Sequence, residues 1–306
     1  MAFWQDYWKS LKPLEVEEPI DVWVHRPLAY LLSKALYPTP ISPNLVTVIS
    51  IIWGLVASVY MFVDTPWHLQ IAGVSLFLSA VFDCADGQLA RMRGTSSVLG
   101  RMLDGAADLV VSSVSVVGGT YLVWKATHAS PLQDAIVIAL CVVTIVTGSL
   151  HTSNYDHYKN IFLRMTHPKY GEGEDYELAL ERYRATAANA SLAIRLVWPL
   201  YLLYIKRQRD YVERFDPYTK VRFAPLPPFN EADAALYREH AGPAMRLWRN
   251  WFGFGSLVFG MSVSIALGVV HYYMLFRLVA LNAVFYGYLR AKQRLASRRA
   301  FEALGY

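Results

Sequence analysis

The sequence predicts an all-α integral membrane protein, a six-transmembrane-helix bundle with an N-terminal interfacial amphipathic helix. Of its 306 residues, 55% are hydrophobic and only 17% are charged, which is too apolar for an ordinary soluble domain of this length. Six charge-poor stretches also approach the roughly 20 helical residues that cross about 30 Å of hydrocarbon. We therefore expect a multi-pass membrane protein.

Each predicted span is an apolar run between polar segments. The six spans are residues 44–63, 66–82, 109–124, 135–155, 251–270 and 272–288. The second and third are short for a crossing unless their charged ends are also helical. Arg277 lies inside the sixth span, where a charge is costly, so it is a functional candidate unless it snorkels to the outer surface.

The positions of Lys and Arg set the predicted orientation. They gather before the first span, between the second and third, and after the sixth: Lys9, Lys12, Arg26, Lys34, Arg91, Arg93, Arg101, Arg290, Lys292, Arg294, Arg298 and Arg299. In a six-span bundle these segments share one side, so the positive-inside rule places both termini in the cytoplasm. This placement explains the net charge of +5 without a nucleic-acid partner.

The spans divide the chain into four segments. These are a cytoplasmic N-terminus with the juxtamembrane helix (1–40), spans one to four (41–155), a polar cytoplasmic insertion with some helix (156–248), and spans five and six with a basic tail (249–306). Within the first segment, residues 20–38 mix Trp23 and leucines with His25 and Arg26, as an interfacial amphipathic helix does. A surface helix packed on protein is the alternative.

Four aspartates at the cytoplasmic ends of the second and third spans carry the chemistry. Helical spacing places two sets of residues on one face each: Asp83, Asp86, Gly87, Ala90 and Arg91, then Gly100, Asp104 and Asp108. If the two helices face each other, four carboxylates converge and repel unless cations lie among them. Oxygen-only ligands favour Mg²⁺, with Mn²⁺ second, and four carboxylates can hold two ions.

Two divalent ions can clamp a pyrophosphate and stabilise both the attacking and the leaving oxygen of an in-line displacement. Gly87 would leave room for a ligand, and Arg91 offers a planar fork of donors to phosphate oxygens. The alternative is a group of solvated loop carboxylates, which is common at helix ends. The regular spacing of the whole set argues against it.

These residues resemble the signature of the CDP-alcohol phosphotransferase (CDP-alcohol phosphatidyltransferase) family, D-x2-D-G-x2-A-R-x8-G-x3-D-x3-D, at every fixed position. The segment Ile41–Thr47 also resembles the Pro-Asn-x-x-Thr stretch that opens the family's first membrane helix. The resemblance covers roughly residues 20–155 and 246–290. It implies a homodimeric membrane enzyme that transfers a substituted phosphate from a CDP-linked donor to an alcohol, with release of CMP, in phospholipid biosynthesis.

The resemblance also implies a role for each matched residue. Asp83 and Asp104 would bridge two metal ions, Asp86 would bind one of them, and Asp108 the other. Asp108 would in addition be the general base that deprotonates the acceptor hydroxyl. The CDP moiety would contact Asn44, Leu45, Val46, Thr47, Gly87, Arg91 and Ser97.

The sequence allows more than one pair of substrates. His151, Asn154, Tyr155 and Lys159 are candidates for an acceptor pocket, although a polar helix end that contacts headgroups fits equally well. The donor is either CDP-diacylglycerol, with an acceptor such as inositol, inositol phosphate, glycerol phosphate or serine, or CDP-choline or CDP-ethanolamine, with a lipid alcohol. Six spans favour the lipid donor. A cation-coupled transporter would instead predict mid-membrane acids and an inverted repeat, neither of which the sequence suggests.

Overall fold

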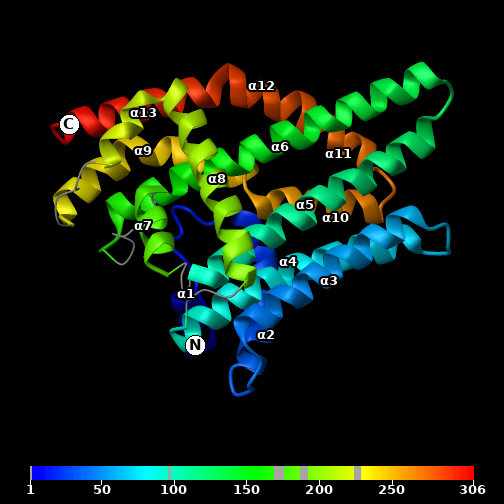
Figure 1. Cartoon of the computed structure of the whole chain (residues 1–306), viewed down its shortest axis with the longest axis horizontal. Helices are drawn as coiled ribbons and strands as arrows, with labels where there is room; N and C mark the ends of the chain where they lie inside the picture. Colours follow the sequence, from blue (N-terminus) through cyan, green and yellow to red (C-terminus); the bar gives the residue numbers. More distant parts are fainter. Residues whose placement is uncertain (1, 96–97, 169–175, 187–191, 224–228) are drawn as a thin grey trace. The chain divides into compact units, whose positions relative to one another are not determined.

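The computed structural model of the chain describes residues 2–95, 98–168, 176–186, 192–223 and 229–306 (Figure 1). Within these ranges the regular structure is helical and no strand occurs, which confirms the predicted all-α class. The chain forms two compact units. Unit 1 comprises residues 1–150 and 250–282, and unit 2 comprises residues 151–249 and 283–306.

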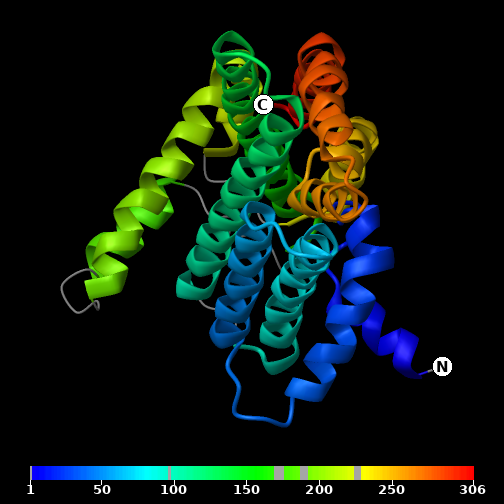
Figure 2. The ribbon, with the colours of Figure 1, turned by 90° about the vertical axis from the view of Figure 1, so that its right-hand side faces the viewer.

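The helices of unit 1 come from both ends of its sequence. They are α1 (Ala2–Ser10), the π-turn η1 (Asp21–His25), α2 (Arg26–Leu36), α3 (Pro43–Phe62), α4 (His68–Arg93), α5 (Val98–Thr127), the first part of α6 (Pro131–Thr166), α10 (Phe254–Ala266), α11 (Val270–Phe276) and the π-turn η5 (Arg277–Leu281). Helix α3 packs along both α4 and α5, and α10 packs on α4 (Figure 2).

Unit 2 contains the remaining helices. They are the end of α6, α7 (Tyr176–Thr186), α8 (Leu192–Phe215), η4 (Pro217–Phe223), α9 (Glu231–Trp251), which ends in unit 1, α12 (Asn282–Val284), which begins there, η6 (Phe285–Leu289) and α13 (Arg290–Ala303). Several of the largest buried side chains of unit 2 are aromatic. The Trp248 ring lies 5.4 Å from that of Tyr158 and 5.9 Å from that of Phe285.

Among the described residues, three helices are long and apolar enough to cross a membrane, namely Pro43–Phe62, His68–Arg93 and Pro131–Thr166. They correspond to the predicted first, second and fourth spans. The six-span count stays a prediction, because α10 is short and several side chains of α5 lie outside the described residues. All three helices begin close to the positions that the apolar runs predict.

Helix α4 continues well past the predicted end of its span at residue 82. It ends only at Gly94, whose φ of 65° lies in the left-handed region that glycine tolerates. The amide of Thr95 then donates to the carbonyl oxygen of Ala90 at 3.0 Å, which satisfies one of the last carbonyls of the helix. As a result, the first half of the aspartate motif lies on one continuous helix.

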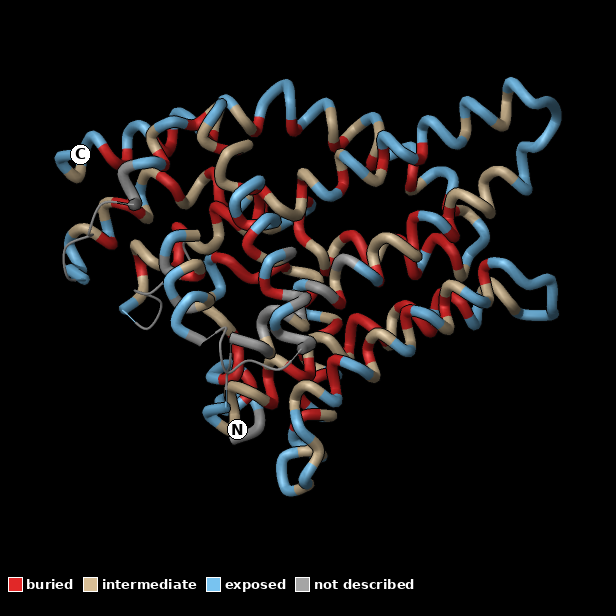
Figure 3. The backbone as a smooth tube through the Cα atoms, viewed as in Figure 1, coloured by how far each residue is buried: buried red, intermediate tan, exposed pale blue. Residues whose placement is uncertain are grey.

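Small residues bring the helices of unit 1 close together. A Cβ at Gly73 of α4 would lie 2.6 Å from the Cβ of Ala266 in α10, so only glycine permits this crossing. Close approach at small residues is typical of helices packed in a membrane. Large apolar side chains of α3, such as Ile52 and Val59, are exposed, and exposed and buried residues alternate along the helices (Figure 3).

The predicted juxtamembrane segment is helical from residue 21 to residue 36, as η1 and α2. Its burial pattern differs from that of a surface helix in a soluble protein, which buries apolar side chains and exposes charged ones. His25 and Arg26 are buried, whereas Trp23, Leu28 and Leu31 are exposed. The outer side of this helix therefore carries large apolar side chains together with the exposed Lys34.

Candidate active site

The first half of the aspartate motif lies on one face of α4. Asp86 is buried and Asp83 is partly exposed. The hydroxyl of Thr47, in the second turn of α3, donates a hydrogen bond to Oδ2 of Asp86. The structure thus joins the α4 motif directly to the segment that opens α3.

A pair of serines fixes the register of α3 against α4. Ser50 Oγ donates to the carbonyl oxygen of Ser79 at 2.9 Å, and Ser79 Oγ donates to the carbonyl oxygen of Ser50 at 2.8 Å. The two helices run antiparallel, because Thr47 of α3 bonds Asp86 of α4 whereas the later Ser50 bonds the earlier Ser79. The hydrogen bond between Thr47 and Asp86 belongs to the same register.

Helix α5 runs parallel to α3 and carries the second half of the motif. A Cβ at Gly54 would lie 2.8 Å from Cγ2 of Val111, and seven residues further along both helices Met61 contacts Gly118. Seven residues before Gly54 and Val111, about 10 Å along each helix, the same register pairs Thr47 of α3 with Asp104 of α5.

The backbones of Asp86 and Asp104 therefore lie at the same level of α3. The side chain of Asp104 and all of Ser97 fall outside the described residues. Asp108 is one turn further along α5 and is partly exposed.

The residues predicted to contact CDP from the first helix differ in their placement. Thr47 and Val46 are buried, and Val46 belongs to the cluster that includes Ala85 and Leu89 of α4. Asn44 is partly exposed, whereas Leu45 is exposed, with its amide bound to the N-cap Ser42 at 3.2 Å. Of residues 44–47, Thr47 is the one that bonds a motif aspartate within the described part of the chain.

Gly87 makes room for Arg91, which lies one turn further along α4. A Cβ at residue 87 would lie 3.3 Å from Nη1 of Arg91, so the guanidinium lies over the glycine. Nε of Arg91 donates to the carbonyl oxygen of Ser10 at 2.8 Å. Sequence reasoning missed Ser10, because a backbone acceptor has no sequence signature.

The donor set of the motif fits hard divalent cations. Its side chains offer carboxylate oxygens and no nitrogen or sulfur, and two of its acids share one face of α4, the chemistry that Mg²⁺ prefers. A second group, Asp21, His25 and Cys84, also has its ligand atoms within 4.8 Å of one another. There Nδ1 of His25 already bonds Oδ1 of Asp21 at 2.8 Å, so this pair acts as an internal hydrogen bond of the juxtamembrane helix.

The four residues predicted for the acceptor pocket lie in unit 2, on the final turns of α6. His151, Asn154 and Tyr155 are buried there, and the His151 ring lies 4.7 Å from that of Phe285. Lys159 forms an ion pair with the carboxylate of Asp156 at 2.6 Å. Their role in acceptor binding stays a prediction.

Arg277 is buried in unit 1 and does not extend to the surface. Its Nη1 donates to the hydroxyl oxygen of Tyr273 at 3.2 Å, and that hydroxyl donates to the carbonyl oxygen of Ser256 at 2.9 Å. A tyrosine thus links this buried cation to the start of α10.

Residues 40–169 match the family model described as CDP-alcohol phosphatidyltransferase. This range contains the start of α3, the whole aspartate motif and the end of α6. The similarity to this family covers that range and less than half of the chain. The predicted resemblance is confirmed for that part of the chain.

Two relatives are similar to part of the chain, and both are named phosphatidylinositol phosphate synthase. That of Mycobacteroides abscessus is 32% identical over 114 residues, which is 37% of this chain and 50% of the relative. That of Corynebacterium glutamicum is 28% identical over 116 residues, 38% of this chain and 51% of the relative. The chain spans about half the length of the curated relatives it matches.

Proposed function

We propose that this chain is a membrane transferase that moves a phosphatidyl group from CDP-diacylglycerol to a polar alcohol and releases CMP. The observation that carries the proposal is the complete aspartate motif on α4 and α5, with Asp86 bound by Thr47 of the helix that opens the family domain. The names of both relatives support a phosphatidyl product, and thus the lipid donor over CDP-choline or CDP-ethanolamine. A phosphorylated inositol is the first acceptor to test.

The motif carboxylates would hold two Mg²⁺ ions, or Mn²⁺ in their place. The ligands would be Asp83, Asp86, Asp104 and Asp108. When bound, these ions would neutralise the pyrophosphate and make CMP a good leaving group.

The side chains of the chain supply orientation and proton transfer. Asp108 takes the hydroxyl proton of the acceptor, whose oxygen bonds to the phosphorus that carries diacylglycerol while the bond from that phosphorus to the CMP oxygen breaks. Arg91 donates to phosphate oxygens of the donor. Gly87, Ser97 and residues 44–47 complete the CDP site.

The proposal places the enzyme across the membrane in six spans, with the aspartates and both termini on the cytoplasmic side. The exposed Trp23, Leu28 and Leu31 support an interfacial position for α2 and η1, because a lipid surface covers apolar side chains that water would not. A homodimer follows from the family resemblance alone.

The test is CMP release by the purified full-length protein in lipid–detergent micelles. CDP-diacylglycerol and CDP-choline are each combined with inositol, inositol phosphate, glycerol phosphate, serine and diacylglycerol. We expect CMP only with CDP-diacylglycerol and one of the polar acceptors, and none after chelation of divalent metal. Absence of CMP from every pairing would overturn the proposal, and cation flux in liposomes would then favour the transporter.

Asp108→Asn tests the mechanism separately. The variant should lose CMP release yet still bind CDP-diacylglycerol, because the amide cannot accept the proton but the other donor contacts remain. Loss of binding with unchanged turnover of the bound fraction would contradict the role of Asp108.

A further inference from the structure

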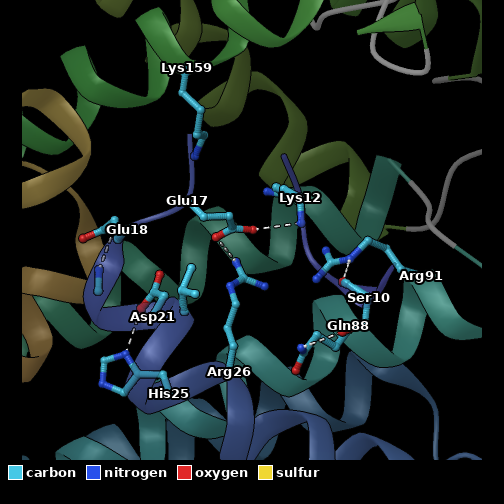
Figure 4. A network of polar contacts seen from close by, with 12 residues as sticks. Ser10, Lys12, Glu17, Glu18, Asp21, His25, Arg26, Gln88, Arg91 and Lys159 are labelled. Carbon is cyan, nitrogen blue, oxygen red and sulfur yellow. Dashed lines mark hydrogen bonds and ion pairs between the residues drawn. The ribbon is translucent and has the colours of Figure 1, made fainter. Parts of the chain in front are cut away.

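The segment that precedes the family domain contacts the motif arginine. Helix α1 ends at Ser10, and the family match begins only at residue 40. The carbonyl oxygen of Ser10 accepts from Nε of Arg91 at 2.8 Å, and Nε2 of Gln88 donates to Ser10 Oγ at 3.1 Å (Figure 4). Two side chains of α4, one turn apart, therefore hold the same residue of α1.

The contact between Ser10 and α4 is buried, and Ser10 is also bonded within the N-terminal segment. Ser10, Tyr7 and Gln88 are exposed by 6%, 1% and 0%. Ser10 Oγ donates to the carbonyl oxygen of Tyr7 at 2.6 Å, and the Tyr7 hydroxyl donates to the carbonyl oxygen of Val22 in η1. The Tyr7 ring also packs against that of Tyr30 in α2, at 5.7 Å. Movement of Ser10 would thus disturb a continuous buried network.

The geometry restricts where the guanidinium of Arg91 can point. One end of the group is held by the Ser10 carbonyl, and Nη1 lies over Gly87. An arginine loses rotamer entropy when it binds a ligand, and a side chain that is already ordered loses less. Nη1 and Nη2 are further donors of the same planar group, and a pair of guanidinium donors can bind phosphate oxygens.

We propose that Ser10 and Tyr7, which lie outside the family domain, are positioning residues that hold the Arg91 guanidinium over Gly87 for the phosphates of the CDP-linked donor. The inference rests on the proposed function, since it assigns Arg91 to the donor. It adds that the N-terminal helix is part of the donor site of this chain.

The first test compares donor KM with kcat. Ser10→Gly removes both side-chain bonds of Ser10 and loosens the carbonyl that holds Arg91, so we expect donor KM to rise about tenfold with kcat nearly unchanged. Tyr7→Phe keeps the ring and loses only the bond to Val22, and should raise KM about threefold. Gln5→Ala, on an exposed position of the same helix, is the matched control and should change neither value.

The second test is a double-mutant cycle with Arg91→Ala. If Ser10 acts through Arg91, Ser10→Gly should have no further effect on donor KM once the guanidinium is absent. The same tenfold rise in donor KM with and without Arg91→Ala would overturn the inference, because a structural defect caused by Ser10→Gly does not depend on Arg91. Unchanged KM in Ser10→Gly and Tyr7→Phe would overturn it as well.

Donor binding without acceptor separates this inference from the proposed function. CDP-diacylglycerol affinity and the thermal unfolding midpoint are measured for each variant in the same micelles. Weaker donor binding in Ser10→Gly at an unchanged midpoint supports positioning, and if Ser10→Gly does not fold, Tyr7→Phe takes its place. A wild-type protein that binds the donor but releases no CMP contradicts the proposed function alone.

Discussion

Glu18 and Asp86 are both buried carboxylates of unit 1, but different groups surround them. The Glu18 carboxylate accepts hydrogen bonds from the amides of Gly255 and Ser256, at 3.0 and 2.8 Å, and from Ser256 Oγ, at the N-terminus of α10. Asp86 accepts from Thr47 and shares its helix face with Asp83. A carboxylate that meets a helix N-terminus stabilises the fold, whereas carboxylates gathered on one face are suited to cations.

The surroundings of Glu18 are built to admit a carboxylate. A Cβ at Gly253 would collide with Glu18, and a Cβ at Gly255 would collide with Asp21, so both glycines leave space for acids of the juxtamembrane segment. Burial, together with the charge of nearby Asp21, raises the pKa of Glu18 to about 7 despite its three donors. Glu18 therefore anchors the N-terminal segment to α10 and titrates near neutral pH.

Asp86→Asn should produce the largest effect, and on activity alone. Loss of a charged ligand should reduce CMP release about a thousandfold, on the order of 4 kcal/mol. The unfolding midpoint should hold, because the amide oxygen can still accept from Thr47. Asp64→Asn, which alters an exposed ion pair with Lys125, is the control. An equal loss of activity in the control would remove the distinction between the two kinds of carboxylate.

Glu18→Ala should have the converse effect. It leaves two amides of α10 buried without the carboxylate that bound them, which should cost roughly 4 kcal/mol of unfolding free energy. CMP release per folded molecule should stay within about threefold. Denaturant unfolding in micelles measures the first quantity, with exposed Glu15→Ala as the control. Full stability in Glu18→Ala would show that the α10 contact is incidental.

Glu18→Gln separates the charge of Glu18 from its hydrogen bonds. The folded pKa of about 7 lies above the ordinary glutamate value of 4.5, so between these pH values the folded state keeps a proton that the unfolded state has lost. The contribution of Glu18 to stability should therefore fall as pH rises from about 4.5 to about 7, by on the order of 3 kcal/mol, and then level off. Glu18→Gln should remove this fall. If the unfolding free energies of the wild type and Glu18→Gln differ by a constant amount over this pH range, the raised pKa of Glu18 is contradicted.

Much of the helical framework follows from local sequence signals. The first span was predicted to begin at residue 44, and α3 begins at Pro43, because Ser42 caps the helix and proline suits its first turn. The second span was predicted to end at residue 82, but α4 continues to Arg93. Hydropathy marks where a helix leaves the hydrocarbon, whereas Gly94 marks where the helix ends.

The anchoring contacts could not be predicted in this way. Arg91 bonds a carbonyl 81 residues away, and Glu18 bonds amides 237 and 238 residues away. Every residue has such backbone groups, so nothing in the sequence singles out the partner. The motif aspartates were recognisable because their own spacing carries the information. The pairing of the Arg91 donor with α1 and of the Glu18 acceptor with α10 becomes visible only once the helices are packed.

Ser297→Ala extends the comparison to unit 2 and should have the smallest effect. Two side-chain hydroxyls bind the buried Asp216 there, Tyr158 at 3.0 Å and Ser297 at 2.7 Å, and the carboxylate also accepts from the amide of Tyr218 at the start of η4. Burial raises the pKa of Asp216 to about 6, and the two hydroxyls oppose this rise. Loss of one should raise the pKa further and cost about 1 kcal/mol at neutral pH.

The readout for Ser297→Ala is unfolding free energy as a function of pH. In the wild type, the contribution of Asp216 should fall as pH rises from about 3.8 to about 6, and in the variant this fall should extend to higher pH. Glu302→Gln, which alters an exposed ion pair on the same helix, should leave the profile unchanged. If Ser297→Ala costs as much as Glu18→Ala, a single hydroxyl donor matters as much to Asp216 as the whole carboxylate of Glu18 does to α10. A cost near 1 kcal/mol instead means that the two amides of α10 account for the greater importance of Glu18.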